Sequence, residues 1–281
     1  MTVAKASAPA STANLGPAFD CIALALSVRC QVTAELADEW SIEHTTEHRP
    51  VPGEGDGILA AAREAVGDRP LALTVHNHVP LGRGLGSSAA AFVAGAAAAL
   101  RAVGDEASPD RVFRIATNLE GHADQTAASV YGGLVLIPAE GMPIRLPLHP
   151  SIRPVVGIPE TKLPTSKARA VIAESHDHHM VVRSLGRVSA LTAGLLTGDP
   201  ELLAAAHGDE IHEAPRAELS PEVGQMIDLA LRAGAMHAAR SGAGPSVVAL
   251  TTAESAGRVS RAFKESGVTV LNSAVDTTGL L

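Results

Sequence analysis

Aromatic side chains are scarce in this sequence, and their scarcity decides how a core can be built. Only 2% of the residues are aromatic: one Trp, one Tyr and four Phe in a chain of 281. Apolar residues still make up 46% and charged residues 19%, which is the balance of a globular protein. We therefore expect Ala, Val and Leu to build the core of one large or two modest domains.

Cysteine is also scarce, and long apolar runs and an excess of positive charge are missing. Cys21 and Cys30 show no metal-ligand spacing and cannot form a disulfide framework, which favours a reducing compartment. No apolar run is long enough to span a bilayer, and Met1–Ala13 lacks the apolar stretch of a secretory signal. We therefore expect a cytoplasmic protein without a membrane partner. With 22 Lys and Arg against 30 Asp and Glu, the net charge of −8 argues against nucleic-acid binding.

Strand and helix patterns follow one another along the whole chain, which predicts an α+β class. Alternation and β-branched residues predict strands at Thr2–Ala8, Ser27–Leu36 and Leu71–Val79. The segment "SIEHTTE" is expected to return against the second of these strands. A weakly marked boundary near Pro147–Arg153 suggests two domains, residues 1–150 and 151–281.

The segment "VPLGRGLGSSAAAFVAG" places three glycines and two serines between a predicted strand and a predicted helix. Gly82, Gly84 and Gly86 can adopt positive φ, and successive N–H groups before a helix N-terminus form a site for phosphate. Ser87 or Ser88 is the expected N-cap of the helix over 89–103. A tight turn is the simpler alternative, but one or two glycines would suffice for it. The loop matches neither the Walker A motif nor the dinucleotide fingerprint.

Three motifs together resemble those of the GHMP kinases, a family that includes galactokinase, homoserine kinase and mevalonate kinase. "PLGRGLGSSAA" resembles their central motif, "PASTANLGPAFD" their N-terminal motif and "SGAGPSVVAL" their C-terminal glycine motif. Their order along the chain is also the family's. The resemblance implies two domains, an N-terminal ribosomal-protein-S5-like domain and a C-terminal ferredoxin-like α/β sandwich.

Further segments resemble the homoserine kinases within that family. They are "ANLGPAFD", "LEGHADQTAASVYGGLVL", "TSKARAV" and "DEIHEAPRAELSPE". The resemblance implies ATP-dependent phosphorylation of the side-chain hydroxyl of L-homoserine, a small-molecule substrate, with ATP and Mg²⁺ as cofactors. The product would be O-phospho-L-homoserine, a precursor in threonine biosynthesis. The sequence leaves open whether the chain acts as a homodimer.

The resemblance also assigns roles to individual residues. Nucleotide phosphates would be bound by Pro80, Gly82, Arg83, Gly84, Leu85, Gly86, Ser87 and Ser88. Mg²⁺ would be held by Ser88 and Glu120. The amino acid would be bound by Asn14, Asp20, His122, Asp124, Thr165, Arg169, Arg216, Gly242 and Gly244. The catalytic group would consist of Ser88, Glu120, Asp124 and Gln125.

Elementary chemistry agrees with these assignments. A hydroxyl and a carboxylate are oxygen ligands that suit Mg²⁺ and leave room for phosphates. An arginine fork suits a carboxylate, and Asp20 suits an ammonium group. Phosphoryl transfer needs alignment and charge stabilisation more than a strong base. Asp124 is the one candidate general base, and substrate binding is its expected task.

Two positions depart from the family pattern. Ala18 stands where glycine is usual, and a positive φ there would cost on the order of 1 kcal/mol. Gln125 replaces asparagine beside Asp124, and its longer amide could reach the same group or crowd the transferred phosphate. Alone, Asn14 could shape a turn, Glu120 could end a helix at the surface, and Gly242 with Gly244 could form a hairpin turn. Two other functions stay open: a different small-alcohol kinase of this family, or a silent nucleotide-binding relative.

Overall fold

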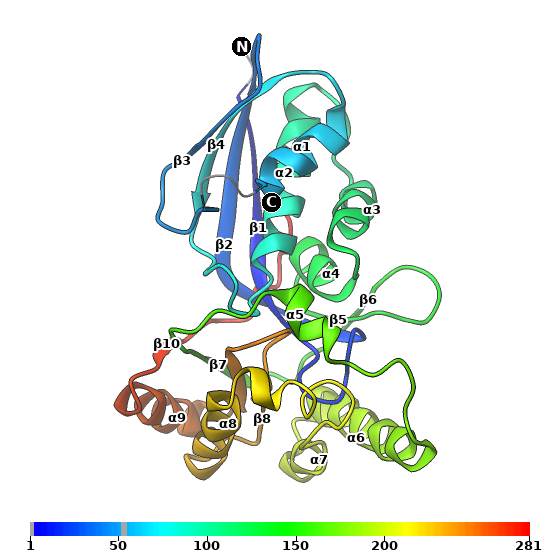
Figure 1. Ribbon diagram of the computed structural model, residues 1–281, viewed down its shortest axis with the longest axis vertical. Helices are drawn as coiled ribbons and strands as arrows, with labels where there is room; N and C mark the ends of the chain where they lie inside the picture. Colours follow the sequence, from blue (N-terminus) through cyan, green and yellow to red (C-terminus); the bar gives the residue numbers. More distant parts are fainter. Residues whose placement is uncertain (1–2, 52–54) are drawn as a thin grey trace.

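The chain folds around two β-sheets, which lie in the upper and lower halves of the view in Figure 1. This computed structural model describes residues 3–51 and 55–281. The first sheet contains β1 (Ala4–Ala13), β2 (Ile22–Leu36), β3 (Ser41–His44), β4 (Leu71–Asn77), β5 (Leu134–Leu136) and β6 (Ile144–Leu146). Thr2, where the first strand was predicted to begin, lies outside the described residues.

The long strand β2 organises the first sheet, because both of its edges are paired. It runs antiparallel to β1 on one side, and to β4 and β5 along different parts of the other side. The prediction that "SIEHTTE" returns against β2 is wrong. With no free edge left on β2, β3 pairs in parallel with β4 instead.

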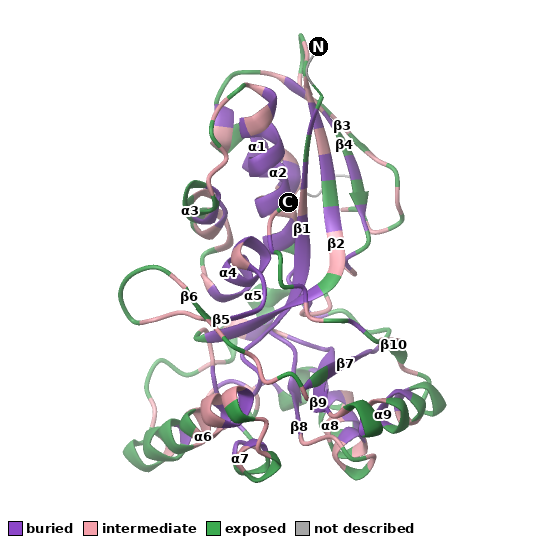
Figure 2. Ribbon diagram, turned by 180° about the vertical axis from the view of Figure 1, so that it is seen from behind, coloured by how far each residue is buried: buried purple, intermediate pink, exposed green. Residues whose placement is uncertain are grey.

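Small side chains dominate the layer that covers this sheet. It consists of α1 (Gly57–Val66), α2 (Ser87–Ala102), α3 (Pro109–Glu120) and α4 (Asp124–Tyr131). Helix α2 contacts β1, β2 and the other three helices, and most of it is buried (Figure 2); half of its residues are buried alanines. The expected core of Ala, Val and Leu is therefore confirmed.

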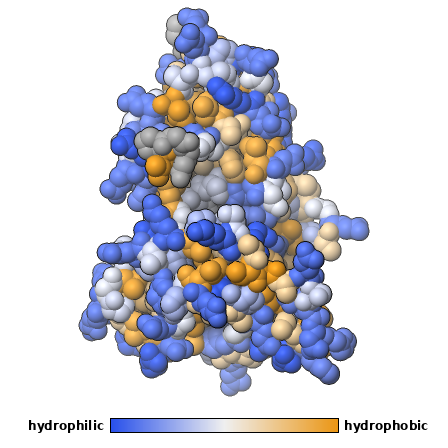
Figure 3. Space-filling model, in the orientation of Figure 1, coloured by the Kyte–Doolittle hydropathy of each residue, from blue (hydrophilic) through white to orange (hydrophobic). Residues whose placement is uncertain are grey.

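The second sheet contains β7 (Arg153–Ile158), β8 (His237–Arg240), β9 (Val247–Thr251) and β10 (Thr269–Leu271), in the order β10-β7-β9-β8. Helices α8 (Glu222–Arg232) and α9 (Ala253–Glu265) pack against it. The remaining helical segments are α5 (Thr165–Ala170), α6 (His178–Thr197), α7 (Pro200–Ala205) and the 3₁₀ turn η1 (Ala217–Leu219). The predicted α+β class is confirmed. On the surface, apolar patches lie near the level where the two halves meet (Figure 3).

The last residues of the chain return to the first sheet. Val275 forms a bridge with Leu26, and Leu281 exchanges two backbone hydrogen bonds with Ser7. The predicted boundary between residues 150 and 151 stays a prediction. We propose that residues 274–281 belong to the N-terminal unit, because their hydrogen bonds are made there. Among the described residues, no helix is both long and apolar enough to cross a membrane.

Two buried histidines join the halves of the molecule at one short loop. His237 on β8 lies with Nε2 2.8 Å from the Leu15 carbonyl oxygen, and His212 with Nε2 2.7 Å from that of Gly16. Burial lowers the pKa of each imidazole to about 4. Both rings are therefore neutral at pH 7, and the loop after β1 is held by hydrogen bonds from the second unit.

We predict that Gly95→Ala destabilises the protein although alanine is the better helix former. A Cβ atom at Gly95 would lie 2.7 Å from the Ile58 carbonyl oxygen, so α1 would have to move. Overpacking of this kind costs about 1–3 kcal/mol. Gly257→Ala in α9 is the control, since a Cβ there meets nothing within 4 Å, and it should be neutral or stabilising by about 0.5–1 kcal/mol. Urea unfolding measures both, and equal effects would contradict the close packing of α1 on α2.

A second prediction concerns the pH dependence of stability. The pKa of His237 is about 4 in the folded protein and near 6.5 when exposed, so unfolding takes up protons between these pH values. Its contribution to stability is complete above pH 6.5 and is lost as the pH falls toward 4. His237→Gln should therefore be destabilised at pH 7.5, and its deficit should shrink by about 3 kcal/mol at pH 4.

Urea unfolding of the unmodified protein and of His237→Gln from pH 7.5 to 4 measures the difference between their free energies of unfolding. The contributions of other titrating groups cancel in that difference. His178→Gln, which removes an exposed imidazole of α6 in place of a buried one, is the matched control. A His237→Gln deficit that is constant with pH would contradict a neutral buried imidazole.

Candidate active site

The glycine loop, residues 80–88, connects β4 to α2 through three left-handed glycines. Gly82, Gly84 and Gly86 have φ of +65°, +73° and +65°. The expectation that Ser87 or Ser88 caps α2 is wrong. The helix begins at Ser87, and Gly86 occupies the N-cap position with no side-chain cap. The left-handed turn at Gly86 replaces a capping side chain, which leaves both serine hydroxyls available for other partners.

Close backbone contacts fix this loop against two other glycine-containing segments. A Cβ atom at Gly84 would lie 2.1 Å from the Ser241 carbonyl oxygen, and one at Gly86 would lie 2.2 Å from the Ser11 hydroxyl. The tight turn considered from the sequence therefore explains part of the glycine content, because two of the glycines are required by packing. The same packing brings the three sequence motifs to one place.

A cavity of about 220 Å³ opens between these segments. It is lined by Asn14, Phe19, Asp20, Gly82, Gly84, Leu85, Gly86, Ser87, Ser88, His122, Asp124, Gln125, Leu163, Pro164, Thr165, Arg169, Arg216, Gly242 and Ala243. Most of the residues selected from the sequence are thus gathered around one space. Four are not part of its lining: Pro80, Arg83, Glu120 and Gly244.

Pro80 and Arg83 lie at a neighbouring hollow of about 360 Å³, together with Arg49 and Lys162. The Arg83 guanidinium donates to the carbonyl oxygens of Pro159 and Thr161, so it is occupied by the backbone of the second unit. Burial lowers its pKa. Its role in phosphate binding stays a prediction.

Ser88 and Glu120 meet beside the cavity. The Ser88 hydroxyl donates to Glu120 Oε1 over 2.7 Å. Burial raises the pKa of Glu120, and the Ser88 hydrogen bond opposes that rise. The two oxygens fit the Mg²⁺ that the resemblance implies, because Mg²⁺ takes few protein ligands and completes its shell with phosphate and water. In the described part of the chain, no group of three or more His, Cys, Asp or Glu could hold a metal alone.

His122 lies between two carboxylates. Its Nδ1 is 3.1 Å from Asp124 Oδ1, and its Nε2 is 3.5 Å from Glu120 Oε1. Burial lowers the pKa of His122, but the hydrogen bond and charge of Asp124 and the charge of Glu120 outweigh it, so the pKa is raised. Asp124 Oδ1 also accepts a hydrogen bond from the backbone N–H of Gln125 over 2.8 Å. This bond holds the buried carboxylate in place.

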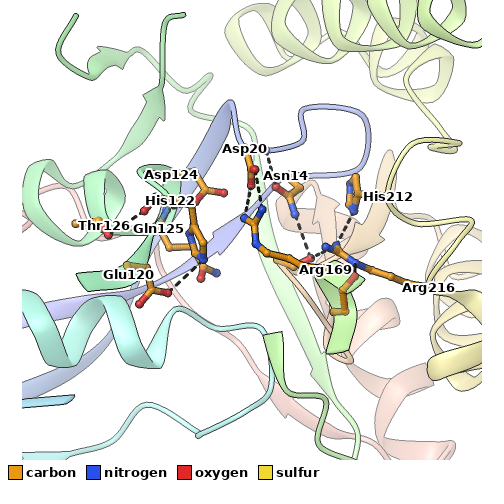
Figure 4. A network of polar contacts seen from close by, with 12 residues as sticks. Asn14, Asp20, Glu120, His122, Asp124, Gln125, Thr126, Arg169, His212 and Arg216 are labelled. Atoms are coloured by element: carbon orange, nitrogen blue, oxygen red, sulfur yellow. Dashed lines mark hydrogen bonds and ion pairs between the residues drawn. The ribbon is translucent and has the colours of Figure 1, made fainter. Parts of the chain in front are cut away.

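Asp20 and Arg169, predicted to bind opposite ends of the substrate, bind each other (Figure 4). Arg169 Nη2 and Nη1 donate to the two Asp20 carboxylate oxygens over 2.7 and 3.1 Å. Asn14 supports the pair, because its Oδ1 accepts from the Asp20 N–H and its Nδ2 donates to the Gly242 carbonyl. Asn14 therefore shapes the loop, and it also lines the cavity.

Arg216 lines the cavity, and it is only 1% exposed. It donates to the Ala168 and Gly242 carbonyls, and its Nη1 lies 2.9 Å from His212 Nδ1. The guanidinium can only donate, so Nδ1 accepts; the Gly16 carbonyl can only accept, so His212 Nε2 carries the proton. Burial and then the nearby Arg240 lower the pKa of Arg216 to about 10.

Ala18 and Gln125, the two departures from the family pattern, differ in their effect on the structure. Ala18 does not adopt positive φ, and it accepts hydrogen bonds within a turn, so it bears no left-handed cost. Gln125 is 8% exposed, lines the cavity, and its Nε2 has no hydrogen-bond partner among the described residues. A Cβ atom at Gly242 would lie 2.8 Å from that nitrogen. Gly244, in turn, faces Arg240 rather than the cavity.

Sequence reasoning missed several residues of this site. Phe19, His212, Leu163, Pro164 and Ala243 line the cavity or support its walls. Phe19 and Ala243 lie inside quoted motifs, and His212 lies four residues before Arg216. Their positions next to selected residues could therefore have identified them, although their residue types alone could not. Leu163 and Pro164 precede "TSKARAV", and nothing in their pattern marks them.

Two family models of the GHMP kinases match parts of this chain. Residues 56–133 match the family model described as GHMP kinases N terminal domain, and residues 191–269 match GHMP kinases C terminal. The first match includes the glycine loop, Glu120 and Gln125, and the second includes Arg216 and Gly242.

Relatives and solved structures extend the match to nearly the whole chain. A protein named homoserine kinase from Moorella thermoacetica is 35% identical, over 86% of this chain and 85% of its own. One from Gloeobacter violaceus is 38% identical, over 91% and 90%. The crystal structure of homoserine kinase from Cytophaga hutchinsonii is 28% identical, covers 100% of this chain and 97% of its own, and has a TM-score of 0.88. The predicted two-domain fold is thus confirmed, and the chain belongs to the GHMP kinase family, among the relatives of the homoserine kinases.

Proposed function

We propose that this protein transfers the γ-phosphoryl group of ATP to the side-chain hydroxyl of L-homoserine. The products are ADP and O-phospho-L-homoserine, a step of threonine biosynthesis. One observation carries the proposal: a carboxylate and two guanidinium groups, from Asp20, Arg169 and Arg216, share a cavity with the glycine loop. Relatives named homoserine kinase, at 35% and 38% identity, support the same substrate.

The nucleotide would lie along the glycine loop. Its phosphates would meet the loop N–H groups and the N-terminus of α2, where the helix dipole favours negative charge. Its base and ribose would extend into the hollow beside Pro80 and Lys162, which is continuous with the loop. Ser88 and Glu120 would hold Mg²⁺, which would neutralise charge on the phosphates when bound.

The amino acid would occupy the opposite side of the cavity. Asp20 would accept the ammonium group, and Arg216, whose partners are two carbonyls and a neutral imidazole, would meet the carboxylate. Arg169 would assist on the same wall. This arrangement would direct the hydroxyl toward Asp124 and Gln125. Thr165, exposed at the start of α5, would border the entrance.

Two buried groups would then act on the reacting atoms. The unpartnered Nε2 of Gln125 is a donor that a phosphoryl oxygen or the substrate hydroxyl can satisfy, and a buried donor without a partner costs about 1–3 kcal/mol. Asp124 would accept a hydrogen bond from the hydroxyl and orient it. Because the proton can leave late and pass to a phosphate oxygen, the reaction does not depend on a strong base.

We infer further that the protein works in the cytoplasm on small molecules and needs neither nucleic acid nor a membrane. The net charge of −8 supports this inference. Whether it acts as a homodimer is an open part of the proposal, and sedimentation of the purified protein decides it.

The decisive experiment is an assay of ADP release with Mg-ATP and a panel of homoserine, mevalonate, shikimate and galactose. We expect turnover with homoserine, and phosphate on its side-chain oxygen in the product. Turnover with another alcohol alone would favour a different small-alcohol kinase. Nucleotide binding without any turnover would favour the silent relative, although the paired Ser88 and Glu120 speak against it.

We predict that Ser88→Ala lowers kcat on the order of 100-fold and weakens the dependence on Mg²⁺, because one of two metal-binding oxygens is lost. The fold should survive, since Ser88 does not cap α2 and is exposed. Ser189→Ala is the control, because that hydroxyl donates to the Leu185 carbonyl of its own helix. An unchanged kcat and Mg²⁺ profile for Ser88→Ala would remove Ser88 from the metal site.

A further inference from the structure

Phe19 is the aromatic side chain at the charged wall of the cavity. It follows the β1 loop directly before Asp20, and its ring lies near two guanidinium groups from different segments. The Arg169 Cζ is 5.5 Å from the ring centroid, and the Arg216 Cζ is 5.6 Å from it. The His212 ring stacks on the Phe19 ring at 4.9 Å between centroids and an interplanar angle of 21°.

Hydrophobic packing does not explain this placement. Phe19 belongs to neither of the apolar clusters formed by the described residues, and its side chain is half-buried at the cavity. Its neighbours are instead two cations, one neutral imidazole and the ion pair between Arg169 and Asp20. An aromatic face is the negative part of the ring quadrupole, so it attracts guanidinium groups where an aliphatic chain would not.

The two arginines also need a reason to remain close together. Burial lowers the pKa of Arg216, and like-charge repulsion from Arg240 and then from Arg169 lowers it further. Asp20 compensates Arg169 in the absence of a ligand. When Asp20 turns to a ligand's ammonium group, Arg169 loses its hydrogen-bonded partner and keeps only the favourable charges of Asp124 and Glu120 within the chain. The Phe19 ring, whose centroid lies within 5.6 Å of both guanidinium carbons, would still attract the two groups when that partner is lost.

We propose that Phe19 is a positioning residue of the substrate site. Its π face keeps Arg169 and Arg216 on one wall of the cavity, at the spacing needed to meet the carboxylate of an amino-acid substrate while Asp20 meets the ammonium group. The proposal rests on the function proposed above. It assigns Phe19 an electrostatic task, which distinguishes it from a residue that only fills space.

Fluorinated phenylalanines at position 19 test this assignment, because fluorine withdraws π density while the ring keeps nearly the same shape. From phenylalanine through the monofluoro and difluoro to the trifluoro residue, KM for homoserine should rise stepwise, by about tenfold in total. KM for ATP, kcat and the melting temperature should each stay nearly constant. Phe19→Tyr should keep a low KM, and Phe19→Leu should raise it as much as the trifluoro residue does.

The matched control is the same fluorinated series at Phe113, whose ring packs against Tyr131 in the N-terminal unit. That series should leave KM for homoserine unchanged. A flat KM across the Phe19 series would overturn the proposal, and so would a rise that is equal for homoserine and ATP. Failure of the proposed function is distinguishable, because the unmodified protein would then release no ADP with homoserine before any substitution is made.

Discussion

The candidate site depends on three segments of chain that touch through their backbones. The Ser241 hydroxyl donates to the Gly84 carbonyl over 2.7 Å and lies 2.9 Å from Thr12 Oγ1, and the Gly242 N–H donates to the Ala13 carbonyl. A side chain at Gly84 has no space here. Because main-chain atoms and short hydroxyl side chains make these contacts, they fix the relative positions of the segments with little freedom. The charged residues of the cavity project from this fixed base.

Much of this arrangement was predictable from the sequence, for a physical reason. Glycines with positive φ, a strand before a helix and a carboxylate after a helix are local features, so residues 82–88 and 120–125 were recognised from motifs. The residues selected near Asn14, Arg169, Arg216 and Gly242 now lie around one cavity. Their separate roles stay predictions until they are tested with ligands.

What sequence reasoning could not provide are the partners of each side chain. Arg83 sits in the glycine loop, yet backbone carbonyls of the second unit occupy its guanidinium. Ser87 and Ser88 are good capping residues, but the left-handed Gly86 takes the N-cap position. β3 pairs with β4 because the edges of β2 are already paired, which only the complete sheet reveals. Each of these outcomes is set by tertiary contacts that no local pattern records.

Backbone strain lies elsewhere in the first motif than expected. Ala18 is unstrained, whereas Asn14, Leu15 and Asp20 have φ of +70°, +46° and +55°. Asn and Asp tolerate this region, but an apolar residue there costs roughly 1–2 kcal/mol. Leu15 is fully buried, and its carbonyl oxygen lies 2.8 Å from His237 Nε2, so burial and the second unit hold the strained turn.

The ion pair between Asp20 and Arg169 has a consequence for selectivity. Without a ligand, Asp20 and Arg169 are each other's ion-pair partners, so opening the pair removes the protein partner of both charges. An amine without a carboxylate would compensate only Asp20, and an acid without an amine would compensate only Arg169. A zwitterion replaces both lost partners at once. If Asp20 and Arg169 bind the substrate as proposed, the closed pair would favour molecules that bring both charges over molecules that bring one alone.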